Sequence, residues 1–114
     1  MLEKLTMETA IAHRIYEVAD KPGEEVQVFI GKPVQYDLNE WHCPYRIVGA
    51  GKDLNFHIAA VDSIQALQLI WPVVDSAISG ADLSLLWGGG KNLGLVSESA
   101  LNRLAKALLG LDFS

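Results

Sequence analysis

The chain has 114 residues, of which 50% are hydrophobic and 20% are charged, and this composition is typical of a folded globular domain rather than a disordered segment. The formal net charge is −5, and the nine Lys and Arg residues are scattered along the chain. The absence of a basic stripe argues against nucleic acid and against anionic membranes as partners. We therefore predict a single domain over residues 1–114.

Cysteine content and hydropathy predict a cytoplasmic protein. One cysteine, Cys43, leaves no partner for an internal disulfide, and the first residues lack the charged-then-apolar pattern of a secretion signal. The uncharged stretch 63–74 is shorter than the ~20 apolar residues that a membrane-spanning helix needs, and it contains Pro72. No membrane span is expected.

A β-hairpin is predicted first. β-Branched and aromatic residues dominate the stretches 8–19 and 25–36, and the turn sequence Lys21-Pro22-Gly23-Glu24 lies between them. Pro33 cannot donate a ladder hydrogen bond, so the second strand should lie at an edge or carry a bulge there. The register of this hairpin stays open, because apolar residues of both parities compete for the buried face of the first strand. The competing sets are Ile11 and Ile15 on one side, and Ala12, Tyr16 and Val18 on the other.

A second hairpin is indicated by the alternation of apolar residues over 41–48 and 54–60, on either side of a glycine-containing stretch. With Gly51-Lys52 as the two-residue tip, the apolar faces of both strands coincide. The pairs in this register are Ala50 with Asp53, Ile47 with Phe56, Tyr45 with Ile58 and Cys43 with Ala60. His42 and His57 would then share a face but lie ~13 Å apart along the ladder.

A helix is predicted from about Ser63 to Ser79, ending near Gly80. Asp62 is a candidate N-cap with Gln65 at the capping-box position, and apolar residues then recur every three or four positions. Pro72 would remove one hydrogen bond inside the helix and bend it.

The remaining segments complete an α+β fold. The apolar stretch 83–87 should form a short strand or a buried tether, and Ser97 is a candidate cap for a C-terminal helix. The predicted architecture is a four-stranded antiparallel β-meander followed by a helix, a short apolar segment that would be a fifth strand, and a C-terminal helix.

Candidate catalytic and cofactor-binding groups do not form a coherent set. Cys43 lies on the predicted apolar face and His57 on the other, which disfavours a Cys–His nucleophile. The three histidines and Cys43 lack the short ligand spacings of zinc sites, so no metal is predicted. The stretch Gly88-Gly89-Gly90-Lys91 resembles the end of a phosphate-binding loop, but Leu85 and Asn92 replace its earlier glycine and its hydroxyl residue. No catalytic residue and no cofactor are therefore assigned.

Three motifs resemble a family of small uncharacterised bacterial domains. They are Ile30-Gly31-Lys32-Pro33, Trp41-His42-Cys43-Pro44-Tyr45-Arg46-Ile47-Val48-Gly49 and Val61-Asp62-Ser63-Ile64-Gln65-Ala66-Leu67-Gln68-Leu69, which match an "IG.P", a "W.CPY.I.G" and a "D..QAL.L" signature. The resemblance extends from about Ala12 to Leu95. Because the family is a domain of unknown function, the resemblance implies neither a reaction nor catalytic residues.

Three functional hypotheses follow. The favoured one is a non-enzymatic module that interacts with itself, as a homo-oligomer, or with another cytoplasmic protein. The second is the binding of a small molecule between the sheet and the kinked helix, with Trp41, Tyr45 and Trp71 as walls. The third is an enzyme, for which Cys43, His42 and His57 would be the residues to test.

Overall fold

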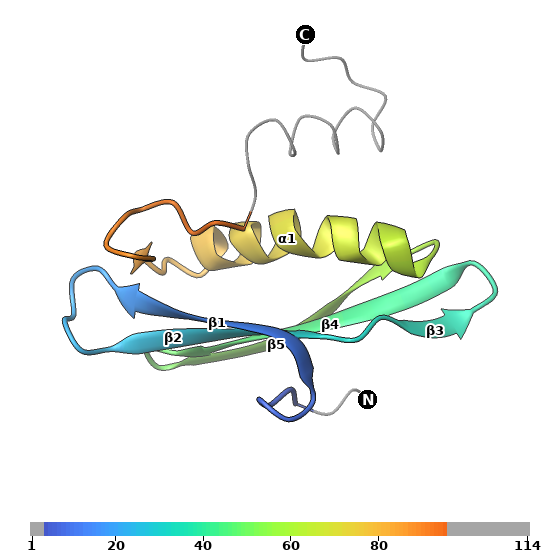
Figure 1. Cartoon of the computed structure of the whole chain (residues 1–114), viewed down its shortest axis with the longest axis horizontal. Coiled ribbons are helices and arrows are strands. Elements are labelled where there is room, and N and C mark those ends of the chain that lie inside the picture. The colour runs from blue at the N-terminus through green and yellow to red at the C-terminus, as the bar shows by residue number, and fades with distance from the viewer. Residues whose placement is uncertain (1–3, 96–114) are drawn as a thin grey trace, which may run out of the picture.

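Antiparallel strands form one sheet, and a long helix lies across one of its faces (Figure 1). The computed structural model describes residues 4–95. Its elements are β1 (Ala10–Val18), β2 (Glu25–Gly31), β3 (Val34–Asp37), β4 (Glu40–Gly49), β5 (Lys52–Ala60), α1 (Ser63–Gly80) and β6 (Leu85–Leu86). The predicted helix after Ser97 lies outside the described residues.

The sheet follows the predicted meander, with one strand divided in two. β1, β2, β4 and β5 are neighbours in chain order. The predicted strand 25–36 is split at Lys32-Pro33, so that β2 pairs with the second half of β4 and β3 with its first residues. A proline without an N–H explains the interruption. β6 pairs with β1, so the segment 83–87 contributes the additional strand.

In β1, the first strand of the first hairpin, the buried residues share one parity. Tyr16 pairs with Val26 and is fully buried, whereas Ile11 and Ile15 are 55% and 45% exposed. Tyr16 and Val18 therefore belong to the core. Val26, the β2 partner of Tyr16, belongs to the same core cluster.

The tip of the second hairpin is Ala50-Gly51, so the predicted register is wrong by two residues. Gly49 pairs with Lys52, Tyr45 with Phe56 and Cys43 with Ile58. Ala50 and Gly51 both have positive φ, 51° and 79°, as a type I′ turn requires. Because side chains alternate with a period of two, this shift leaves every residue on its predicted face.

α1 begins and ends where the sequence predicts. Asp62 Oδ1 accepts a hydrogen bond from Gln65 N at 2.7 Å, and Val61 N donates to Gln65 Oε1 at 3.0 Å. These contacts satisfy two backbone donors at the start of the helix. Pro72 lies inside α1. The buried residues of the helix, which pack toward β4 and β5, are Ala66, Ile70, Val74 and Ile78.

The segment after α1 covers the part of the same face that β1 contributes. Tyr16 Oη donates to Leu93 O at 2.8 Å, and Arg14 Nη1 donates to the same oxygen at 3.1 Å. The Arg14 guanidinium also lies 3.8 Å from the centroid of the Trp87 ring. Within residues 4–95, no helix is long and apolar enough to span a membrane.

Candidate functional site

The outer edge of β5, here called the β5 edge, is the most prominent unpaired feature of the sheet. β4 pairs with β5 from Trp41 to Gly49, and among residues 4–95 no strand pairs with its other side. β5 is nine residues long and contains neither proline nor a bulge, which are common devices that protect edge strands. The opposite edge of the sheet is partly paired, because β6 lies beside β1. The β5 edge is therefore open along its whole length within the described part of the chain.

The hairpin geometry determines which backbone groups point outward at the β5 edge. A two-residue turn makes Gly49 and Lys52 the closing hydrogen-bonded pair, and hydrogen-bonded pairs then alternate along the ladder. The N–H and C=O groups that this alternation directs away from β4 belong to Asp53, Asn55, His57 and Ala59. One of these groups, the Asp53 carbonyl, accepts a 3.4 Å hydrogen bond from Asn55 Nδ2 within residues 4–95.

Aromatic side chains flank the β5 edge on both faces of the sheet. On the helix side, Phe56 is 56% exposed and its ring centroid lies 6.0 Å from that of Tyr45. On the other side, the His57 ring stacks on His42 at 4.3 Å, and His42 stacks on Tyr36 of β3 at 4.6 Å. The predicted separation of ~13 Å between the two histidines is wrong, because the two-residue register shift makes them diagonal neighbours.

Of the residues considered for catalysis, Cys43 lies apart from the two stacked histidines. Cys43 is fully buried beneath α1, and its Sγ donates to Gly31 O at 3.4 Å. Burial raises the pKa of this thiol to about 11. His57 lies on the opposite face, as predicted, and His42 Nε2 lies 2.6 Å from Glu40 Oε2. Within residues 4–95, no group of three His, Cys, Asp or Glu side chains is arranged to hold a metal ion.

The three residues considered as walls of a ligand site lie in different surroundings. Trp71 lines a cavity of about 290 Å³ between α1 and the sheet, together with Arg14 and Val28. Trp41 and Tyr45 are not among the residues that line it. Tyr45 is 7% exposed and belongs to the core, while Trp41 pairs with Ala60 at the end of the hairpin.

A family model for a domain of unknown function, DUF6968, matches residues 12–96. The chain belongs to this family. The match includes most of β1 and all of β2 to β6, and therefore the β5 edge. No curated protein and no solved structure matches the chain.

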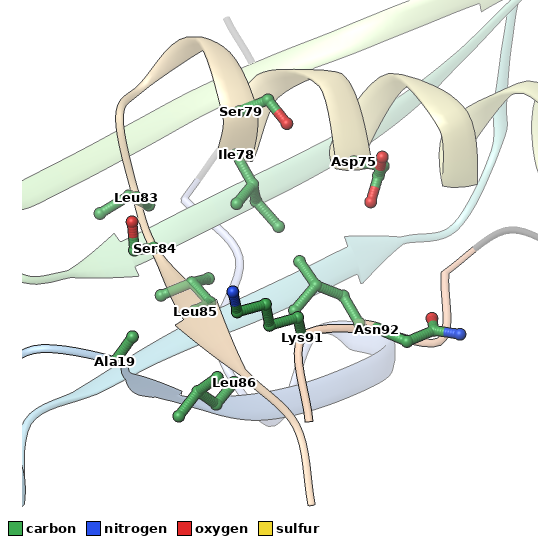
Figure 2. Close-up of a pocket in the computed structure, with 11 residues that line it drawn as sticks. Ala19, Asp75, Ile78, Ser79, Leu83, Ser84, Leu85, Leu86, Lys91 and Asn92 are labelled. Carbon is green, nitrogen blue, oxygen red and sulfur yellow. The ribbon is translucent and has the colours of Figure 1, made fainter. Parts of the chain in front are cut away.

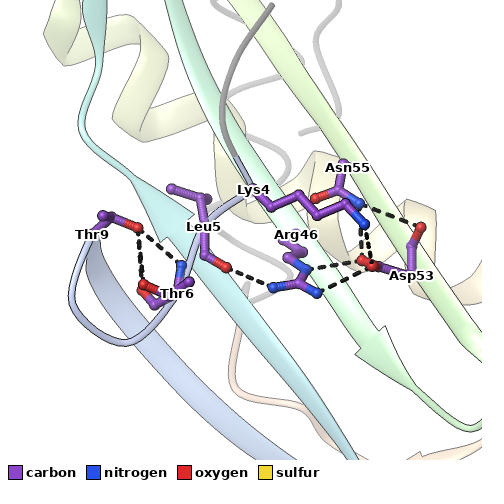
Figure 3. Close-up of polar contacts among 7 residues, drawn as sticks. All are labelled: Lys4, Leu5, Thr6, Thr9, Arg46, Asp53 and Asn55. Atoms are coloured by element: carbon purple, nitrogen blue, oxygen red, sulfur yellow. Dashed lines mark hydrogen bonds and ion pairs between the residues drawn. The ribbon is translucent and has the colours of Figure 1, made fainter.

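In this DUF6968 domain, a polar cluster fixes the segment before the matched residues onto the helix-free face (Figure 3). Arg46 donates through Nε and Nη2 to the two oxygens of Asp53, at 2.8 and 3.1 Å, and through Nη1 to Leu5 O at 2.8 Å. Lys4 Nζ lies 3.1 Å from Asp53 Oδ2. The hydrogen bonds from Arg46 hold the pKa of Asp53 well below its usual range. The predicted register pairs Asp53 with Ala50 and misses this cluster, because only the observed register makes Arg46 the diagonal neighbour of Asp53.

The Leu5 side chain explains the glycine beneath it. Leu5 is 8% exposed, and a Cβ added to Gly31 would lie 2.9 Å from Leu5 Cδ2 and would also overlap Pro44 Cγ. Residues 4–9 lie on the side of the sheet opposite α1 (Figure 1). They therefore cover the middle of the helix-free face and leave the β5 edge exposed.

A larger cavity lies near the other edge of the sheet, where α1 ends and β6 follows (Figure 2). Its volume is about 600 Å³. Its lining combines apolar side chains with Asp75, Ser79, Ser84, Lys91 and Asn92.

Proposed function

We propose that this DUF6968 domain is a non-enzymatic interaction module that pairs with a second copy of itself through the β5 edge. The observation that carries the proposal is an open edge strand of nine residues with a half-exposed phenylalanine at its centre. Edge strands with these properties add readily to other strands. No geometry in the described residues supports a catalytic role for Cys43, because its thiol is buried and protonated.

The outward-pointing backbone groups favour one register. Antiparallel pairing about a two-fold axis at Phe56 joins Asp53 to Ala59 of the second copy, and Asn55 to its His57. The two strands would exchange about eight backbone hydrogen bonds, two for each of the four pairs. Phe56 would face Phe56 of the second copy in a non-hydrogen-bonded pair, where side chains approach most closely. The exposed large hydrophobic residue of β5 would thus be covered.

Charge does not oppose this pairing, although the whole chain has a net charge of −5. The charges of β5 are one Lys and one Asp, Lys52 and Asp53, and the Asp is already paired with Arg46 and Lys4. In the antiparallel arrangement, Lys52 would lie beside the end of β5 in the second copy that leads to Asp62. The edge is therefore locally neutral and compatible with its own copy.

A proline variant tests the pairing directly. Asn55→Pro removes an N–H that points away from β4, so the β4–β5 ladder should survive while pairing with a second copy is lost. Asn55→Ala is the matched control, because it also loses the side-chain contacts to Asp53 but keeps the N–H. We expect light scattering after size exclusion to give a dimer for the wild type and Asn55→Ala, and a monomer for Asn55→Pro. A monomeric wild type at ~100 µM, or a dimeric Asn55→Pro, would contradict the proposal.

Cross-linking tests the register. In a non-hydrogen-bonded pair the Cα atoms are about 4.5 Å apart, which lies within the range that a disulfide spans. Phe56→Cys in a Cys43→Ala background should form a covalent dimer under mild oxidation. Tyr36→Cys in the same background, on β3, is the control and should not. Equal cross-linking of both variants would show that the contact is not specific to the β5 edge.

A further inference from the structure

The cavity of about 600 Å³ beside β6 has a lining of apolar and polar side chains, and none of the lining residues belongs to β5. Its apolar walls come from the last turns of α1, from β6 and from the adjoining loops. They are Ala19, Ile78, Leu83, Leu85, Leu86 and Leu93. A volume of this size is typical of cavities that bind small molecules.

Two opposite charges border the cavity from different elements. Asp75 approaches from α1, and Lys91 extends from its loop toward Leu85 of β6 (Figure 2). Neither side chain forms a hydrogen bond or an ion pair with another residue among 4–95. Ser79, Ser84 and Asn92 add neutral hydrogen-bonding groups around the same space.

We propose that this cavity binds a small zwitterion with an apolar body, which is the chemistry of apolar amino acids and short apolar peptides. An ammonium group would pair with Asp75, a carboxylate with Lys91, and the apolar body would lie on Ile78 and Leu85. A simple anion would be repelled by the Asp75 carboxylate, and a simple cation would be repelled by Lys91. Neither ion is therefore complementary to both charges. A zwitterion is complementary to both charges and to the apolar surface between them.

The test is a titration of the full chain followed through its amide signals by NMR. The probes are leucine and leucyl-leucine, with N-acetylleucine amide as a probe that has the same apolar body but no charges. We expect leucine or leucyl-leucine to shift the amide signals of Ser79, Ser84 and Leu86 in a saturable manner, and the blocked compound to shift them far less. Because hydrogen bonds to charged groups contribute about 1.5–3 kcal/mol, Asp75→Asn and Lys91→Met should each weaken binding about tenfold or more.

Lys32→Met and Asp37→Asn provide matched controls, because they remove one charge of each sign at positions outside the cavity lining. Both should bind as the wild type does. The proposal is overturned if neither charged probe causes saturable shifts up to ~10 mM, if the blocked compound binds equally well, or if the cavity variants and the controls behave alike. For each variant, amide signals that match those of the wild type away from the substitution would show that the variant is folded.

Discussion

The imidazole rings of His42 and His57 stack with their centroids 4.3 Å apart and their planes inclined by 22°. With Tyr36 they form a continuous aromatic row across β3, β4 and β5 on the helix-free face. This row joins the β5 edge to the interior strand β4 through side chains as well as through the backbone ladder.

Loss of this stack should weaken the attachment of β5 moderately. We expect His57→Ala to lower the free energy of unfolding by about 0.5–1.5 kcal/mol, the usual contribution of an aromatic pair. The free energy of unfolding is measured by urea denaturation, with circular dichroism as the signal. Lys52→Ala, on the same strand, should change stability by less than about 0.5 kcal/mol. Equal effects of the two substitutions would show that the stack does not contribute.

The buried face of α1 should dominate the stability of the helix layer. Ile70 is fully buried, and Ile70→Ala should cost about 2–5 kcal/mol through lost burial and the cavity it leaves. Ile64 is 69% exposed on the same helix, and Ile64→Ala should cost less than about 0.5 kcal/mol. Comparison of the two unfolding midpoints checks the orientation of α1, and a larger effect at Ile64 would refute it.

Two glycines of the second hairpin should differ sharply in their tolerance of a side chain. Gly49 has φ +134°, and a Cβ there would overlap Glu25 O on the neighbouring strand. Gly51 has φ +79° with no atom within 4 Å of an added Cβ. We expect Gly51→Ala to cost about 1–2 kcal/mol from backbone strain alone, and Gly49→Ala about 3 kcal/mol or more. Thermal unfolding of both variants tests this order.

Asp53 should make stability fall in acid. Its folded-state pKa is lowered chiefly by Arg46, so its stabilising contribution is complete above the unfolded-state pKa of about 3.9 and is lost as pH falls toward the folded-state value. Between pH 5 and 2, the free energy of unfolding should therefore depend less on pH in Asp53→Asn than in the wild type. Arg46→Gln removes the main cause of the shift and should flatten the profile similarly. An unchanged slope in both variants would exclude this contribution.

Cys43 should be inert while the protein is folded. With a pKa raised to about 11, only about one thiol in a thousand is ionised at pH 8, and the sulfur is fully buried. We expect no reaction with a thiol reagent until denaturant is added. The exposed thiol of the Tyr36→Cys variant is the positive control, because Tyr36 is 72% exposed. Rapid labelling of wild-type Cys43 in native buffer would contradict its placement beneath α1.

Local patterns predicted most elements of the fold because each depends on short-range chemistry. The N-cap at Asp62, the interruption at Pro33 and the common face of Cys43, Tyr45 and Ile47 follow from capping, from a missing donor and from alternation. The predicted hairpin tip, Gly51-Lys52, was wrong. A shift of two residues preserves hydrophobic alternation, so that pattern cannot distinguish Ala50-Gly51 from Gly51-Lys52.

The candidate sites were less accessible to sequence reasoning because they depend on contacts between distant residues. The β5 edge depends on which strand ends the sheet. The stack of His42 on His57 depends on the register of the second hairpin, which hydrophobic alternation alone does not determine. The cavity between Asp75 and Lys91 forms only when the segment after α1 returns to β1. The choice of Trp41, Tyr45 and Trp71 rests on their aromatic character, which does not report whether side chains line the same cavity.

The hydrogen bond from Tyr16 to Leu93 joins residues 77 positions apart in the chain. Such a contact closes a long loop and gains its stabilisation only after the intervening strands and α1 have formed. Residues 83–95 should therefore be acquired late during folding and released early by partial opening, while the meander stays intact. In hydrogen exchange, the amides of β6 should lose protection before those of β2 and β4, and this local release would give a small molecule a route into the space beside Ile78.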